Sequence, residues 1–332
     1  MALLFSIIVP VYNREEEVKE LLESLSHQSD KGFEVVIVED GSTLPCRATA
    51  EAYSSDVALQ YFFKDNEGRS PARNYGMDHA RGDYFIFVDS DCILPPDYIE
   101  KLRHCLNEKW RDCFGGPDDA HSSFTDMQKA INFAMTSFLT TGGIRGGKVQ
   151  MEKFVPRTFN MGFSREVYEK VGGFREMFSE DIDMSTRIRL GGYSPELLRK
   201  VKVYHKRRGT LGKFWKQVHV FGMSRITLQL LYPGSMKAVH WAPAIFTIGS
   251  LALLAMSLSD PKWLIPLALY ILALWTSACV STKSIKVGCL AVAASMVQLF
   301  GYGTGFLRAY IWKILLRHGR DEEQEIKMRK GK

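Results

Sequence analysis

The chain has 332 residues, of which 46% are hydrophobic and 24% are charged, and its formal net charge is +6. This length allows one good-sized domain and an appendage. The charge is unevenly distributed, because residues 1–196 carry a net charge of −10 whereas residues 197–332 carry 21 Lys and Arg against 5 Asp and Glu. The asymmetry predicts an acidic, soluble part followed by a basic, apolar tail that meets a surface.

The cysteines and the N-terminus argue against two classes of protein. None of the six cysteines forms a Cys-x-x-Cys pair. A zinc site is therefore unsupported, and reduced thiols facing the cytosol are expected. Met1–Pro10 is too short for a signal peptide and leads directly into a strand, so we expect no such segment. We also expect no nucleic-acid partner.

The first 90 residues alternate β-forming runs with helical patterns. Strands are expected at Leu4–Pro10, Phe33–Val38, Leu59–Phe63 and from Tyr84 to Asp89. Glu15–His27 has the apolar spacing of an amphipathic helix, and Ser70 and Pro71 are expected at the N-cap and first turn of another. This order predicts the α/β class, with a doubly wound, mostly parallel sheet and right-handed crossovers.

Polar residues follow three of these strands, at Pro10–Asn13, Glu39–Asp40 and Asp89–Asp91. Because the carboxyl ends of parallel strands lie at one edge of a sheet, we expect the three ends to converge on one pocket. Asp89 and Asp91 suit a Mg²⁺ or Mn²⁺ ion that also holds phosphate oxygens, although Asp-x-Asp alone is more often an acidic turn.

A nucleotide fits this pocket. Tyr12 is expected to stack on or flank a base, Asp40 to accept a base N–H, and Arg73 to reach the base or its phosphates. No Gly-x-Gly-x-x-Gly follows the first strand, which weakens a dinucleotide site and excludes a P-loop.

The second half of this region leaves alternatives open. Phe124–Leu139 is predicted to be helical, and the glycine-rich Gly142–Lys148 is either a mobile lid or a flexible connector. Asn160 is a candidate for capping the backbone. Lys200–Arg208 is predicted to be a last edge strand that carries a basic run.

Carboxylates open the helix expected at Met184–Leu190. Negative side chains at a helix N-terminus are favoured by the helix dipole alone, so Asp181, Asp183 or both are candidate caps.

Five motifs occur in a fixed order: Ser6-Ile-Ile-Val-Pro10-Val-Tyr12-Asn13, Val38-Glu-Asp40-Gly-Ser42, Gly68-x-x-x-Ala72-Arg73-Asn74, Val88-Asp89-Ser-Asp91 and Ser179-Glu180-Asp181-Ile-Asp183. Together they resemble the family-two glycosyltransferases of the GT-A fold. The resemblance covers about residues 4–225.

The resemblance implies a nucleotide-sugar donor (UDP-, GDP- or dTDP-linked), a divalent Mg²⁺ or Mn²⁺, and inversion at the anomeric carbon. It implies that donor contacts come from the following residues: Pro10, Tyr12, Asp40, Arg73 and Asp89. It further implies that Asp89 lies by the ribose or the metal, that Asp91 binds the metal, that Asp181 is the catalytic base, and that Asp183 is the better candidate for the cap. Asn160 and Glu180 are candidate contacts to the sugar or acceptor. His205 either completes the metal or diphosphate site or is ordinary packing.

Transfer of a sugar expels a nucleoside diphosphate through an oxocarbenium-like state. A metal neutralises the charge that builds on this leaving group, and a separate carboxylate removes the proton of the acceptor. This reaction therefore requires at least a pair of carboxylates that binds the metal and one separate carboxylate that acts as the base.

Trp241–Leu258 and Trp263–Val280 each lack charge over about 18 residues, the length of a bilayer-crossing helix, with soluble core helices as the alternative. Lys213–Gln217 and Phe221–Leu231 are expected to form an interfacial amphipathic helix. Val287–Leu307 is also apolar. A third crossing would place several cations outside, against the positive-inside rule, so we expect this stretch to lie in or re-enter the interface.

The sequence thus predicts a GT-A domain at 1–210, an interfacial helix and linker at 211–235, a membrane region at 236–316 and a charged tail at 317–332. We expect a cytoplasmic-membrane enzyme with its catalytic domain on the cytoplasmic side, adding one sugar to a lipid-linked or glycan acceptor in cell-surface glycan synthesis. A processive polysaccharide synthase is one alternative, although Gln217-Val-His-Val-Phe221-Gly222 departs from the Gln-x-x-Arg-Trp of such enzymes. A catalytically silent nucleotide-sugar-binding membrane protein is the other.

Overall fold

The computed structural model describes residues 3–119, 124–142, 154–206 and 209–318. The chain forms two compact units. Among the described residues, the first unit contains 3–119 and 154–206, and the second contains 124–142 and 209–318.

A seven-stranded sheet organises the first unit, with strand order β3-β2-β1-β4-β8-β6-β9. The strands are β1 (Phe5–Val11), β2 (Phe33–Asp40), β3 (Ala58–Lys64), β4 (Tyr84–Phe87), β6 (Cys113–Gly115), β8 (Met161–Ser164) and β9 (Glu196–Leu197). Strand β8 alone runs against its neighbours in this sheet. The mostly parallel sheet and the four strands expected in the first 90 residues are confirmed.

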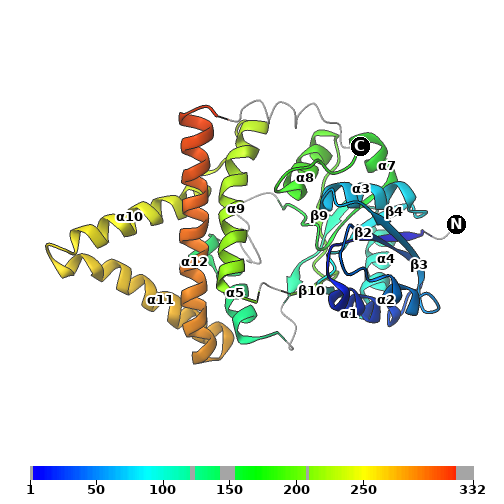
Figure 1. Ribbon diagram of the computed structural model, residues 1–332, viewed down its shortest axis with the longest axis horizontal. Helices are drawn as coiled ribbons and strands as arrows, with labels where there is room; N and C mark the ends of the chain where they lie inside the picture. Colours follow the sequence, from blue (N-terminus) through cyan, green and yellow to red (C-terminus); the bar gives the residue numbers. More distant parts are fainter. Residues whose placement is uncertain (1–2, 120–123, 143–153, 207–208, 319–332) are drawn as a thin grey trace. The chain divides into compact units, whose positions relative to one another are not determined.

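Helices cover both faces of this sheet (Figure 1). They are α1 (Glu15–Ser26), α2 (Arg47–Ala52), α3 (Arg69–His79), α4 (Tyr98–Glu108), α7 (Arg165–Val171) and α8 (Glu180–Leu190). Side chains alternate along β1, so that Ile7 and Val9 face α1 and α4 whereas Ile8 faces α3 and α8. All three are fully buried. A strand that buries both faces must be apolar throughout, which is why this run reads as continuous β-formers.

Helix α3 begins earlier than predicted. Its N-cap is Gly68, with φ +99°, and its first residue is Arg69. Ser70 and Pro71 therefore lie inside the first turn, where a proline nitrogen is tolerated because it has no intrahelical acceptor. The glycine determines the start because its φ lies where residues with a Cβ are strained.

The strand predicted as an edge strand is central instead. β10 (Val203–His205) lies between β5 (Cys92–Ile93) and β7 (Asp118–Asp119) in a separate three-stranded sheet. Its pairing with β5 sets His205 opposite Cys92. Residues 143–148 of the glycine-rich loop lie outside the described residues.

The second unit is helical. It contains α5 (Asp126–Thr136), α6 (Phe138–Thr141), α9 (Leu211–Leu231), α10 (Ala242–Met256), α11 (Ile265–Thr282) and α12 (Ile285–Ala309). Short turns η1 (Ala238–Trp241) and η2 (Pro261–Leu264) precede α10 and α11, and the π-helical η3 (Tyr310–Leu315) continues α12. Helix α5 packs on α11 and α12 although it falls within the range predicted for the first domain. Its apolar faces find their partners there. The predicted boundaries otherwise stay a prediction.

Three helices of this unit are long and apolar enough to cross a membrane: Ala238–Met256, Pro261–Thr282 and Ile285–Leu315. The first two include the runs expected from the sequence. The third continues without a break through Gly301, Gly303 and Gly305, whose missing side chains let α9 and α10 approach its backbone.

Candidate functional site

Helix α3 contributes the most buried cation of the first unit's described residues. The side chain of Arg73 is 2% exposed, and its guanidinium donates to Asp89 Oδ1 at 2.8 Å and to Glu180 Oε1 at 2.9 Å. Arg69, one turn earlier, donates to Glu180 Oε2 at 2.6 Å. The network joins α3, the end of β4 and the start of α8. It thereby brings together three residues that the sequence assigned to the site: Arg73, Asp89 and Glu180.

Glu180 is 2% exposed, and both of its oxygens accept from arginines. A contact with sugar or acceptor stays a prediction and would require one of these bonds to be exchanged. Burial acts to lower the pKa of the Arg69 guanidinium, but Glu180, Asp89 and Asp181 together raise it above its ordinary value.

Asp181 is the carboxylate predicted to be a base, and it lies in the first turn of α8. Its Oδ1 accepts the Ile182 amide at 2.8 Å and its Oδ2 accepts Arg157 Nη1 at 3.1 Å. Burial acts to raise its pKa, but Arg157, the amide of Ile182 and Arg69 together lower the pKa below the usual value. Asp181 is therefore ionised at neutral pH.

Ser179, two residues before Asp181, has a φ of +64°, which lies in the left-handed region. Such a conformation is strained for a residue with a side chain and is frequent at functional sites. The side chain of Ser179 makes no capping bond to the helix.

Asp183 is not a helix cap, and that prediction is wrong. Its side chain is fully buried between Arg187 Nε at 2.9 Å and Arg175 Nη1 at 3.3 Å. It holds α8 against the preceding turn because Arg187 also donates to the backbone of Gly173.

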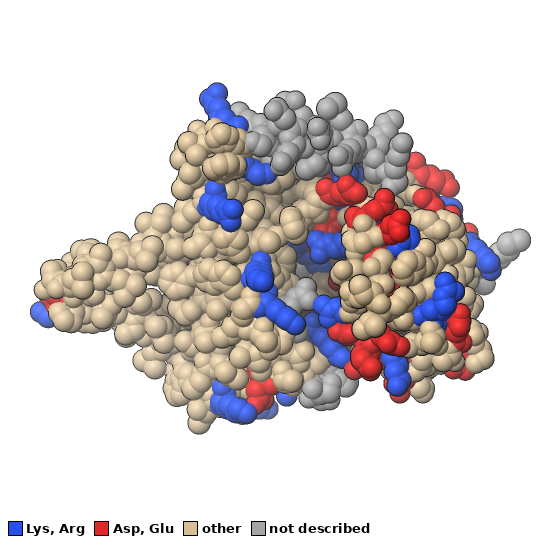
Figure 2. Space-filling model, viewed as in Figure 1, with Lys and Arg blue, Asp and Glu red and all other residues tan. Residues whose placement is uncertain are grey.

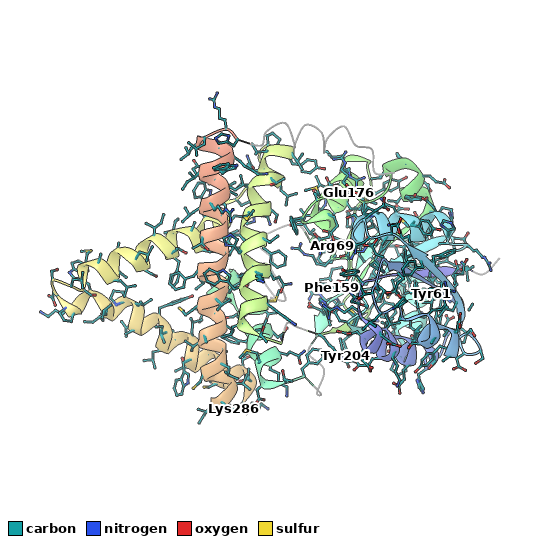
Figure 3. The ribbon with its side chains drawn as sticks, in the orientation of Figure 1. Tyr61, Arg69, Phe159, Glu176, Tyr204 and Lys286 are labelled. Carbon is teal, nitrogen blue, oxygen red and sulfur yellow. The ribbon has the colours of Figure 1, made fainter. Side chains whose placement is uncertain are left out.

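The second cluster of site residues surrounds His205. Its Nε2 lies 3.2 Å from Asp91 Oδ1 and its Nδ1 lies 3.9 Å from Asp118 Oδ2. The ring stacks on Phe159, with centroids 4.8 Å apart. Potential ligand atoms of Asp91, Cys92 and His205 all lie within 4.8 Å of one another. In Figure 3, Arg69, Phe159 and Tyr204 are labelled along one edge of the first unit, and Tyr61 lies away from that edge on β3.

Asp40 ends β2 and holds the loop that leads into α3. Its carboxylate accepts Lys64 Nζ at 3.1 Å and the amides of Glu67 and Gly68 at 3.0 and 2.8 Å. This positions the start of α3. A contact with a base stays a prediction.

Pro10 and Tyr12 lie at the end of β1, at the same edge of the sheet as Asp40 and Asp89. Tyr12 is 51% exposed, so it is open to a ligand. Asn160 is different, because it is fully buried and bonded on both sides of its amide. It accepts Tyr98 Oη at 2.7 Å and donates to the carbonyl of Val201 at 2.9 Å. A contact between Asn160 and a sugar stays a prediction.

Sequence reasoning missed several residues of this site. Arg69 was detectable, because it stands four residues before Arg73 and thus on the same face of α3. Glu39 was assigned no role, yet it is fully buried and accepts the amide of Cys46 at 2.9 Å and Tyr61 Oη at 3.0 Å. Burial and this carboxylate raise the pKa of the Tyr61 hydroxyl. Asp118 and Arg157 gave no local signal, since tertiary folding alone brings them here.

Comparison with known proteins supplies the family. The model of "Glycosyl transferase family 2" matches residues 6–172, just over half of the chain. An uncharacterized glycosyltransferase of Rickettsia felis is 42% identical over 95 residues, which make up 29% of this chain and 16% of that relative. The chain therefore spans a small part of this curated relative.

Among the solved structures that match, two cover more than nine-tenths of this chain. The mannosyltransferase PcManGT from Pyrobaculum calidifontis, in complex with GDP-Man and Mn²⁺, is 18% identical with a TM-score of 0.54, over 95% of this chain and 87% of that one. TarS 1–349 of S. aureus, in complex with UDP-GlcNAc, is 20% identical with a TM-score of 0.50, over 91% and 90%. At this identity the likeness shows the fold, which is of the GT-A type.

Proposed function

Because the chain belongs to glycosyl transferase family 2, we propose that it transfers a sugar from a nucleotide-diphosphate sugar to an acceptor, with inversion at the anomeric carbon. The observation that carries this proposal is that carboxylates lie on two different elements of the first unit. Asp89 and Asp91 leave the end of β4, whereas Asp181 stands on α8 with its own cation, Arg157. One site suits the donor and the other suits the acceptor.

Asp181 is proposed as the general base. It is ionised, and its side chain is 16% exposed, so an acceptor hydroxyl can approach it. As the acceptor oxygen bonds to the anomeric carbon, Asp181 takes the hydroxyl proton and the bond from that carbon to the diphosphate breaks. The nucleoside diphosphate leaves with the electron pair of the broken bond. Attack on the face opposite the leaving group inverts the configuration.

A divalent Mg²⁺ or Mn²⁺ is the proposed cofactor. The residues fit such an ion, because Asp91 Oδ1 and His205 Nε2 lie 3.2 Å apart. Asp89 stands two residues before Asp91 in the sequence. Carboxylate oxygen with one imidazole suits Mn²⁺, and carboxylate oxygen alone suits Mg²⁺. When bound, the ion neutralises charge on the diphosphate. The solved complex of PcManGT with GDP-Man and Mn²⁺ supports this assignment.

Asp40, Arg73, Tyr12 and Pro10 are the proposed donor contacts. Arg73 and Asp40 are held by internal bonds, which fixes them before a ligand arrives. Such preorganisation reduces the free energy spent on ordering the site. The nucleotide sugars in the two solved relatives, GDP-Man and UDP-GlcNAc, support a donor of this class.

A lipid-linked or glycan acceptor at the cytoplasmic membrane is proposed from the second unit. Its three apolar helices suit membrane attachment. Donor nucleotides are cytosolic, so the catalytic unit is proposed to face the cytoplasm. Three apolar helices are few for a polymer channel, which favours single transfer in cell-surface glycan synthesis.

The full-length chain purified in detergent tests this proposal. Saturation binding of UDP-, GDP- and dTDP-sugars with Mn²⁺ should identify one preferred donor, and a lipid-phosphate acceptor should gain a single sugar. A ladder of longer products would indicate a processive synthase. Donor binding with neither hydrolysis nor transfer on any acceptor would indicate a silent binding protein.

A further inference from the structure

The three apolar helices of the second unit have different surroundings. Each of these helices contains an apolar stretch of 18 residues. Other parts of the protein bury 22% of this stretch in Ala238–Met256 and 11% in Pro261–Thr282, but 44% in Ile285–Leu315. The first two present their sides outward, whereas the third is covered along much of its length by other helices. Apolarity alone therefore does not show that all three enter lipid.

Helix α9 lies parallel to the later half of α12. Val218 packs against Gly301, and further along both helices Lys313 donates to Thr227 Oγ1 at 3.2 Å. Helix α9 carries three cations: Lys213, Lys216 and Arg225. If α12 crossed the bilayer, α9 would be carried into the hydrocarbon with it. Charged side chains in that environment are costly unless they reach the interface.

Helix α5 covers the earlier half of α12 in the same way. Ala130 and Phe133 pack with Val287 and Ala291. At the end of this contact Lys286 pairs with Asp126 at 2.8 Å. The Asp126–Lys286 pair thus lies at the start of α12, and a helix with three cations covers its later half. Any stretch of α12 long enough to span a bilayer includes part of this covered half.

The α10–α11 hairpin has the opposite character. No residue from Ala238 to Ser259 or from Trp263 to Thr282 is Asp, Glu, Lys or Arg. Phe246 touches both Phe300 of α12 and Tyr270 of α11, with centroids 5.4 and 5.3 Å apart. Beyond that point large apolar side chains are exposed on both helices: Ile248, Leu251, Leu254, Leu258, Leu264 and Ile265.

Figure 1 shows α10 and α11 converging on their turn away from α12. Figure 2 shows their surface free of Lys, Arg, Asp and Glu except at this turn, which carries Asp260 and Lys262. The 19 residues of Ala238–Met256 extend ~28 Å as a helix, close to the ~30 Å of a hydrocarbon core. Trp241 at one end and Trp263 at the other suit the two interfaces.

We propose that α10 and α11 cross the bilayer as a hairpin, and that α12 lies with α9 and α5 along the face from which the hairpin enters. This inference rests on the membrane attachment proposed above. The hairpin is the segment solvated by lipid. Helix α12, despite its length, is a brace at the interface, and both ends of the hairpin return to the same side.

Accessibility of single cysteines tests the proposal in the full-length chain. Four of the six native cysteines are buried. A chain with Cys279→Ser and Cys289→Ser should therefore show little labelling of its native cysteines. Three exposed positions then report the two faces: Ser259→Cys at the turn, Ile285→Cys at the start of α12 and Leu316→Cys after η3. A membrane-impermeant maleimide is applied to spheroplasts of the expression host and to inverted vesicles from the same cells.

We expect Ile285→Cys and Leu316→Cys to be labelled in the same preparation and Ser259→Cys in the other, each by at least about tenfold. Labelling of Ile285→Cys and Leu316→Cys from opposite faces would overturn the proposal, because α12 would then cross. Labelling of Ser259→Cys from the face of Ile285→Cys would also overturn it. Carbonate extraction separates these failures from failure of attachment, since a chain released by carbonate is not embedded at all. Sugar transfer in detergent tests the catalytic proposal independently.

Discussion

Asp181 and Asp183 stand two residues apart on α8, and the same substitution should affect them in opposite ways. Asp181→Asn keeps the size of the side chain and most of its hydrogen bonds but cannot take a proton at neutral pH. General-base catalysis contributes about 10²–10⁴-fold, so transfer should fall by that factor, equivalent to about 2.7–5.4 kcal/mol in the barrier. Donor affinity and folding should stay nearly unchanged.

Asp183→Asn should instead affect stability. The carboxylate has no exposed surface and lies between Arg187 and Arg175, so its loss leaves buried positive charge uncompensated. Removing one partner of a buried pair costs about 3–5 kcal/mol, and because Asn still accepts hydrogen bonds we expect about 3 kcal/mol. For a unit of this size that corresponds to a Tm lower by roughly 6–12 °C.

The assay measures Tm by circular dichroism, donor affinity by titration and transfer by product formation on both variants of the full-length chain. The two losses should separate cleanly, in rate for one variant and in Tm for the other. Near-normal transfer by Asp181→Asn would refute its role as the base. A normal Tm for Asp183→Asn would refute the importance of the buried pair.

The remaining predictions concern the metal, a helix contact and pH. Transfer should vanish in excess EDTA and return with Mn²⁺ or Mg²⁺, and full activity without free metal would contradict the proposed role of Asp91. A Cβ on Gly305 would lie 2.0 Å from the His219 carbonyl oxygen, whereas one on Gly249 would meet nothing within 4 Å. Gly305→Ala should therefore cost about 1–3 kcal/mol of stability, measured as Tm, while Gly249→Ala should be neutral or slightly stabilising; equal effects would show that the close packing is unimportant. The pKa of Asp181 is lower in the folded protein than in the unfolded chain. Its ionised form therefore stabilises the fold at every pH above the unfolded-state pKa, and this stabilisation is lost only as the pH falls through the folded-state pKa. Transfer should accordingly show no loss through Asp181 between about pH 8 and pH 5, and Arg157→Gln should move the acid limb of kcat/KM to higher pH; an unmoved limb would mean that Arg157 does not control this carboxylate.

Local sequence determined the strands and the motifs. β1 and β4 are recognisable because strands buried on both faces are uniformly apolar, and the parallel arrangement puts their polar ends at one edge. Asp89 and Asp91 could therefore be predicted to lie at that edge, whereas the role of Asp181 was predicted from the resemblance alone. Arg73 was recognised from its motif.

Tertiary structure decided what each polar group does with its neighbours. Glu180 and Asp183 flank Asp181 in sequence, but which carboxylate is buried depends on cations from α3, on Arg175 and on Arg187. His205 reaches Asp91 because a three-residue strand pairs between two others, an arrangement too short to carry a pattern. The same holds for the partners of α12. The flanking cations alone placed this stretch at the interface, but the charged helices packed on it are brought there by contacts across more than 80 residues of chain. Local periodicity reports how apolar a segment is, and only the folded chain specifies which partners cover it.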